Sequence, residues 1–361
     1  MRRPLQMSER PGVWTRPLFN INLAGWRRLF ARYQARLDRR LRVRALTTGG
    51  LFSALQAMQE RLFAAQLNAL ALQDPVFIVG HWRSGTTLLH ELMALDEGLL
   101  SPTTRQCFNP HSFLLSGKSA DAGTAVVRPS GDRAVSSDSP QEEEFALLCL
   151  GCPSPYEAFI FPGAMRNIGA LTDPQEFSED CRRQWEQSLI RFLKGVSLGK
   201  AGRLLLKSPT NTFRIAALRR LFPGAAVVQI VRNPAPVIVS TMDLWNRMWE
   251  RYALGPRLDN VELRETVIDS WVAMERKLRD QMQDWRGEAF TTIKYEELTA
   301  QPYRTIERIY SELRLGTCPS AERVSRFLAD SPQLRPSPAV DPELEAVLRK
   351  RCAEIFDRYG Y

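Results

Sequence analysis

The chain alternates between short apolar runs and longer segments in which apolar residues recur at helical spacing. Four apolar runs of strand length are predicted to form buried strands, at residues 76–79, 203–207, 225–231 and 291–295. Helices are predicted at residues 88–95, 145–150, 177–198, 211–222, 234–252, 261–285, 303–313, 320–328 and 342–359. Strands separated by helices favour an α/β fold, in which helices cover both faces of a central parallel sheet and ligands bind at the carboxyl ends of the strands.

The first 72 residues are predicted to form a basic helical extension outside this body. Apolar residues recur from residue 22 to about residue 72, and the Thr47-Thr48-Gly49-Gly50 stretch predicts a break between two helices. Residues 1–50 hold twelve arginines and two acidic residues, a charge of +10 in a chain of net charge +9. Two interpretations stay open. The apolar stripe packs on the main domain or a second subunit, or residues 14–45 contact an anionic membrane surface.

Composition is typical of a soluble globular protein with one large or two ordinary domains. The 361 residues are 44% hydrophobic and 25% charged. No apolar run reaches the roughly eighteen residues of a spanning helix, and the N-terminus lacks a secretory signal. Six scattered cysteines suggest no disulfide framework. We therefore expect a cytoplasmic protein without a nucleic-acid partner, associated with the inner membrane face if the extension binds lipid.

A polar loop at residues 80–87 connects the first predicted strand to the following helix. This geometry aims backbone N–H groups and the positive end of the helix dipole at one point, which predicts an anion site. Gly85 lets the backbone approach a phosphate, while Ser84, Thr86 and Thr87 can donate hydrogen bonds. Arg83 supplies a fixed cation. The P-loop of a nucleotide triphosphatase or kinase needs a lysine where Thr86 stands, so that class is kept only as an alternative.

Two other predicted strands also end in polar residues. Lys207 is the last residue of the strand at 203–207, and Arg232 directly follows the strand at 225–231. Ser240 lies eight residues after Arg232, about two turns into the helix that Pro234 begins. An arginine and a hydroxyl at this separation can hold a second phosphate. The pattern therefore predicts a ligand with two phosphate ends.

Together these motifs resemble those of the PAPS-dependent sulfotransferases, in the bacterial branch related to tyrosylprotein sulfotransferases. Residues 80–87 are similar to that family's 5′-phosphosulfate loop, Gly-x-Pro-Arg-Ser-Gly-Thr-Thr, with Trp82 in place of proline. Residues 231–240 are similar to its 3′-phosphate motif. The resemblance covers residues 75–315 and implies a P-loop-like sandwich, with a sulfotransferase domain at residues 73–361. It also implies sulfuryl transfer from 3′-phosphoadenosine 5′-phosphosulfate (PAPS) to a hydroxyl or amine acceptor, without a metal.

The resemblance also implies roles for single residues. Arg83 and Lys207 would stabilise charge on the sulfuryl group and the leaving phosphate during in-line transfer. The 5′-phosphate would be bound by Ser84, Gly85, Thr86 and Thr87, and the 3′-phosphate by Arg232 and Ser240. A different class of function is a membrane-surface binding protein with a degenerate sulfotransferase fold, which would work through its basic N-terminus.

Deprotonation of the acceptor requires a general base. The tyrosylprotein branch has a glutamate beyond the loop, where this chain has Gln106. Residues 98–170, rich in Pro, Ser and Gly, are predicted to form an acceptor loop or lid. Within this region the candidates for the base are Glu142, Glu143 and Glu144, with the last two favoured, and then His111. The acidic residues equally fit a role at a helix N-terminus.

Overall fold

The computed structural model describes residues 19–34, 38–116, 126–127, 134–282, 289–330 and 338–361. The central sheet has five parallel strands in the order β2 (Leu99–Leu100), β5 (Arg203–Lys207), β1 (Val76–Val79), β6 (Ala226–Val231) and β7 (Phe290–Lys294). Phe77 of β1 pairs with Leu206 on one side and Val227 on the other. The predicted parallel sheet is confirmed. β2 was not predicted, because two residues are too few to show a periodicity.

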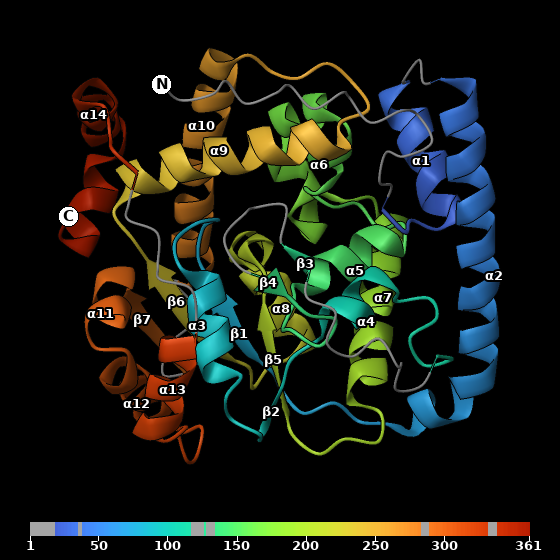
Figure 1. Ribbon diagram of the computed structural model, residues 1–361, viewed down its shortest axis with the longest axis horizontal. Helices are drawn as coiled ribbons and strands as arrows, with labels where there is room; N and C mark the ends of the chain where they lie inside the picture. Colours follow the sequence, from blue (N-terminus) through green and yellow to red (C-terminus); the bar gives the residue numbers. More distant parts are fainter. Residues whose placement is uncertain (1–18, 35–37, 117–125, 128–133, 283–288, 331–337) are drawn as a thin grey trace, which may run out of the picture.

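Helices cover both faces of the sheet, and β1 is therefore apolar at every position. Val76 and Ile78 pack in one apolar cluster with residues of α3 (Thr86–Met93) and α12 (Pro302–Leu313). Phe77 and Val79 pack in a second cluster with residues of α7 (Glu179–Ser197) and α8 (Ile215–Leu221). Figure 1 shows the sheet at the centre of the molecule, with α11 to α14 on one side and α1 and α2 on the other.

The remaining elements surround this core. Within the predicted lid region and just beyond it lie α4 (Thr104–Phe108), β3 (Val126–Val127), β4 (Ala134–Val135), α5 (Glu143–Cys149), α6 (Glu157–Ile160), η1 (Pro162–Asn167), η2 (Gly169–Leu171) and η3 (Pro174–Glu176). After β5 come η4 (Pro209–Phe213), α9 (Pro234–Tyr252), α10 (Asn260–Met282), α11 (Tyr295–Ala300), α13 (Ala321–Asp330) and α14 (Pro342–Tyr359). The helix predicted at 211–222 is thus divided into the 3-10 turn η4 and the helix α8. Residues 117–125 and 128–133 of the lid region lie outside the described residues.

The N-terminal segment forms two helices, but they do not divide where the sequence predicted. α1 (Leu23–Tyr33) is followed by α2 (Arg39–Ala69), which continues without a break through Gly49 and Gly50. A Cβ on Gly49 would lie 2.9 Å from Cδ1 of Trp26 and 3.1 Å from the Cα of Leu23. The glycine therefore permits close contact between α1 and α2, and the predicted break was wrong.

The inner face of α1 packs on the α/β body. Trp26 and Leu29 are fully buried in the apolar cluster that also contains Phe159 and Trp245. Asn22 accepts a hydrogen bond from the N–H of Gly25 as the N-cap of α1, and its amide donates to the carbonyl of Leu150 at 2.9 Å. The packing interpretation is confirmed for this face. No helix of the described residues is long and apolar enough to cross a membrane.

Candidate active site

The loop between β1 and α3 is held by hydrogen bonds of its own residues and of Thr212. The N–H of Gly80 donates to Thr212 Oγ1 at 2.9 Å, and Ser84 Oγ donates to the carbonyl of His81 at 2.7 Å. Gly85 is the N-cap residue of α3 and has a φ of 100°, in the left-handed region that favours glycine. Since Gly85 has no side chain to cap the helix, the amides and dipole of the first turn face the loop, which suits an oxyanion.

Arg83, Arg232 and Ser240 meet beside this loop. Arg83 Nε donates to Ser240 Oγ at 2.8 Å, and Arg232 Nη1 donates to the carbonyl of Arg83 at 3.0 Å. The guanidinium carbon of Arg232 lies 4.1 Å from the centre of the Tyr295 ring, a cation–π contact that orients the arginine. Burial lowers the pKa of Arg232, although a guanidinium remains charged in a protein. The neighbouring strands β1 and β6 thus deliver cations to one place.

Lys207 reaches the other side of the same loop from the end of β5. Its side chain is buried, and Nζ lies 3.4 Å from Thr87 Oγ1, in the first turn of α3. Nζ also donates to Glu142 Oε1 at 2.5 Å, and the two side chains form a salt bridge. The ammonium group of Lys207 therefore contacts both a hydroxyl in the first turn of α3 and the carboxylate of Glu142.

Glu142 is held by a chain of hydrogen bonds that begins in the loop. Trp82 Nε1 donates to the Tyr156 hydroxyl at 3.2 Å, and that hydroxyl donates to Glu142 Oε2. Burial and the nearby carboxylate raise the pKa of Tyr156 well above its usual value, which keeps its proton in place for donation. Trp82, the residue that departs from the usual loop motif, thus connects the loop to Glu142 through Tyr156.

Glu143 and Glu144, which the sequence favoured as the base, make other contacts. Glu143 accepts from Asn211 Nδ2 at 2.5 Å, and burial raises its pKa to about 7. Glu144 accepts from Thr210 Oγ1 at 2.9 Å and forms a fully buried salt bridge with Arg214. Both carboxylates fasten α5 to residues 210–214. In the described part of the chain, their hydrogen bonds and ion pairs do not include Lys207.

His111 lies against the N-terminal helices. Its ring stacks on Phe52 of α2 at 4.4 Å between centres, and Nε2 lies 2.8 Å from the carbonyl of Asn20. Burial lowers the pKa of His111, which favours the neutral ring. The structure thus gathers Arg83, Ser84, Gly85, Thr86, Thr87, Lys207, Arg232 and Ser240 at one end of the sheet, with Glu142 beside Lys207.

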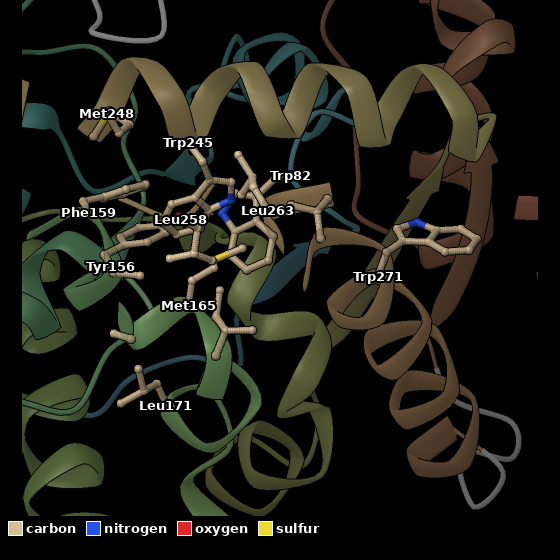
Figure 2. Packing of buried hydrophobic residues seen from close by; sticks show 14 of the residues in the cluster. Trp82, Tyr156, Phe159, Met165, Leu171, Trp245, Met248, Leu258, Leu263 and Trp271 are labelled. Atoms are coloured by element: carbon tan, nitrogen blue, oxygen red, sulfur yellow. Dashed lines mark hydrogen bonds between the residues drawn. The ribbon is translucent and has the colours of Figure 1, made fainter. Parts of the chain in front are cut away.

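An aromatic cluster adjoins the site beneath α9. Figure 2 shows Trp82, Tyr156, Phe159 and Trp245 close together, with Met165 and Leu258 among them. The ring centres of Phe159 and Trp245 are 4.6 Å apart, and those of Trp82 and Trp245 are 6.4 Å apart. The surroundings of Glu142 on the Tyr156 side are consequently apolar.

The sequence missed the connection of Glu142 to Lys207 and Tyr156. These partners lie 65 and 14 residues away along the chain, and no periodicity relates them. Glu142 is the N-cap residue of α5 with an extended backbone, whereas Glu143 and Glu144 are the first residues of the helix. The one available signal was Trp82, which stands where the resembled motif has proline and whose indole N–H needs a hydrogen-bond acceptor when it is buried.

Phosphate-bearing donors need a preorganised cluster of amides and cations, and the end of this sheet provides one. The fold and the site therefore suit a protein that binds a phosphate-bearing ligand at the carboxyl ends of its strands. A sequence model described as the sulfotransferase family matches residues 75–317. The chain belongs to this family and is a sulfotransferase.

Relatives and solved structures agree with this assignment. The omega-hydroxy-beta-dihydromenaquinone-9 sulfotransferases Stf3 of Mycobacterium bovis and Mycobacterium tuberculosis are each 32% identical over 359 residues, which cover 96% of this chain and 92% of theirs. The fold is similar to that of sulfotransferase STF9 from Mycobacterium avium, with a TM-score of 0.67, 22% identity and coverage of 96% and 88%. Sulfotransferase STF1 from Mycobacterium tuberculosis H37Rv gives a TM-score of 0.65, 17% identity and coverage of 91% and 92%. The predicted enzyme class is confirmed, and the kinase, triphosphatase and degenerate-fold alternatives are not favoured.

Proposed function

We propose that this enzyme transfers the sulfuryl group of PAPS to a hydroxyl group of a menaquinone-derived lipid. The observation that carries the acceptor proposal is the 32% identity, over nearly the whole chain, to sulfotransferases named for a hydroxylated dihydromenaquinone. The apolar cluster of Trp82, Tyr156 and Trp245 beside Glu142 suits such an acceptor better than a carbohydrate or a charged amine. All six cysteines are free thiols, which fits a reducing cytoplasm.

The donor would bind across two connected anion sites. The residues of the loop, Ser84 to Thr87, would hold the 5′-phosphosulfate at the N-terminus of α3. Arg232 and Ser240 would hold the 3′-phosphate. Arg83 of the loop contacts Ser240, and Arg232 contacts the Arg83 carbonyl, so the two anion sites are adjacent. One ligand with an anionic group at each end would therefore reach both sites. When bound, PAPS supplies a sulfuryl group on a phosphate leaving group.

Glu142 is the general base that we propose, in preference to Glu143, Glu144 and His111. Glu142 would accept the proton of the acceptor hydroxyl while the new S–O bond forms, and the leaving phosphate would keep the electrons of the broken S–O bond. Lys207 would stabilise the charge on the sulfuryl oxygens. Lys207 Nζ lies between Thr87 and Glu142, so an anionic donor at the loop would compete with Glu142 for the ammonium group. This competition supports the role of Lys207 at the sulfuryl group and the role of Glu142 as the base.

The test is the turnover of a hydroxylated menaquinol with PAPS by the wild type and by Glu142→Gln. We expect Glu142→Gln to lower kcat by about 100- to 10,000-fold, the usual contribution of a general base, while calorimetry shows that adenosine 3′,5′-bisphosphate still binds. Glu143→Gln is the matched control, because it preserves the acceptor for Asn211. Equal losses of kcat in both variants, or a loss only in Glu143→Gln, would refute the assignment of Glu142.

A further inference from the structure

The outer face of α2 carries an apolar stripe that no other described element covers. Val43, Leu51, Met58 and Leu62 are 53%, 58%, 47% and 60% exposed. At about 100° per residue, their spacing places all four within one third of the helix circumference. Thr47, Ala54 and Ala65 lie on the same stripe and are also exposed. Figure 1 shows α2 as the outermost element on its side of the molecule.

The stripe is not required for packing, because α2 uses its opposite face for that purpose. Leu41, Ala45 and Leu67 are buried on the inner face. Gln59 is also buried, and its amide donates to the carbonyl of Pro110 at 2.8 Å. Of the six large hydrophobic side chains exposed in the described part of the chain, four belong to this one helix. A concentrated apolar surface of this kind indicates a partner.

The charges of α2 indicate what kind of partner it is. Arg40 and Arg61 are exposed and lie on the same face as the stripe, whereas Arg42 lies on the side toward α1, with its guanidinium carbon 5.7 Å from the centre of the Phe30 ring. Glu60 is the single acidic residue of the 31 residues of α2. A second copy of the chain, joined face to face by a two-fold axis, would bring the same cationic surface to the contact. An anionic surface complements it better.

We propose that the outer face of α2 docks on an anionic lipid bilayer. The helix, about 46 Å long at 1.5 Å per residue, would lie in the plane of the interface, with its arginines at the headgroups and its apolar stripe at the acyl boundary. The site overlaps the sequence prediction of residues 14–45 only at the start of α2, because Trp26 of the predicted segment is buried inside the protein. The biological purpose of docking rests on the proposed lipid acceptor, because docking would bring the enzyme to the membrane that holds it.

Sedimentation of the full chain with lipid vesicles tests the proposal. Wild-type protein should pellet with vesicles of phosphatidylglycerol and phosphatidylcholine and much less with phosphatidylcholine alone. Leu51→Glu/Leu62→Glu should lower the partition coefficient by about tenfold or more, since two apolar anchors are lost and two repelling charges are added. Arg40→Gln/Arg61→Gln should weaken only the binding to phosphatidylglycerol, by about tenfold or more, because both arginines lie on the stripe face. Val261→Glu/Val347→Glu is the matched control, because both valines are exposed outside α2.

Three results overturn the proposal. The first is wild-type protein that stays in the supernatant with phosphatidylglycerol vesicles, and the second is a stripe variant that pellets as the wild type does. The third is a dimer in solution that Leu51→Glu/Leu62→Glu converts to a monomer while vesicle binding is absent, which assigns the stripe to a second copy. Sulfation of a hydroxylated menaquinol in detergent separates this test from that of the acceptor. Activity without vesicle binding contradicts docking alone, and vesicle binding without activity contradicts the acceptor alone.

Discussion

The replacement Gly85→Ala is expected to weaken the binding of adenosine 3′,5′-bisphosphate, the desulfated donor. The added Cβ would lie 2.3 Å from Cδ2 of Tyr295, far inside van der Waals contact. The φ of 100° is strained for any residue with a side chain. The ring of Tyr295 cannot move freely, because Arg232 lies 4.1 Å from its centre. The loop therefore relieves the strain by leaving the conformation that binds the donor.

The expected size of the effect follows from these two contributions. A non-glycine residue in the left-handed region costs about 1–2 kcal/mol, and displacement of the Tyr295 ring from Arg232 costs about 0.5–1 kcal/mol more. Binding must restore the strained conformation, so a total of about 1.5–3 kcal/mol corresponds to a loss of affinity of about 10- to 150-fold.

Isothermal titration calorimetry with adenosine 3′,5′-bisphosphate measures this loss. Gly50→Ala is the matched control, because a Cβ at Gly50 meets no atom within 4 Å and that residue lies far along the chain in α2. In Gly85→Ala/Tyr295→Ala the clashing ring atoms are removed, and partial recovery of affinity relative to Gly85→Ala indicates that the ring is the obstacle. A Gly85→Ala variant with wild-type affinity refutes the reasoning, since the loop would then tolerate both strain and contact.

Three further outcomes are expected. Thermal denaturation should show that Gly49→Ala destabilises the fold by about 1–3 kcal/mol, because the added Cβ collides with Trp26. Gly50→Ala should stabilise the fold by about 0.5–1 kcal/mol, because alanine favours a helix and no atom lies near its Cβ. Equal effects of the two substitutions contradict the packing argument. In calorimetry, Ser240→Ala should weaken the binding of adenosine 3′,5′-bisphosphate about tenfold and leave the binding of adenosine 5′-phosphosulfate, which has no 3′-phosphate, unchanged. An equal loss of affinity for both ligands contradicts the assignment of Ser240 to the 3′-phosphate. Burial raises the pKa of Glu143 from 4.5 to about 7, so the folded state holds a proton that the unfolded state releases, and this group's contribution to stability falls as pH rises from 4.5 to 7. Urea denaturation should therefore show a smaller fall in Glu143→Gln than in the wild type, and identical pH profiles contradict the shift.

The sequence by itself determined four of the five strands of the central sheet and the order of strand, loop and helix at the candidate donor site. Residues 76–79 are apolar throughout, Gly85 follows within one loop, and Thr86 begins a helix, so strand, loop and anion-binding N-terminus are neighbours in the chain. In the same way, Arg232 directly follows the strand β6 and Ser240 lies in the next helix, α9. Such local arrangements depend on backbone geometry over a few residues, and a sequence pattern therefore reveals them.

Tertiary structure decided which carboxylate meets Lys207 and how the N-terminal helices pack. Glu142, Glu143 and Glu144 are chemically alike, and their surroundings differ only because residues far along the chain, Lys207 on one side and Arg214 on the other, reach them in the folded state. Gly49 likewise signals a helix break locally, but contact with Trp26 makes a glycine favourable inside a continuous α2. Side-chain contacts between distant segments set these features, and no local pattern encodes them.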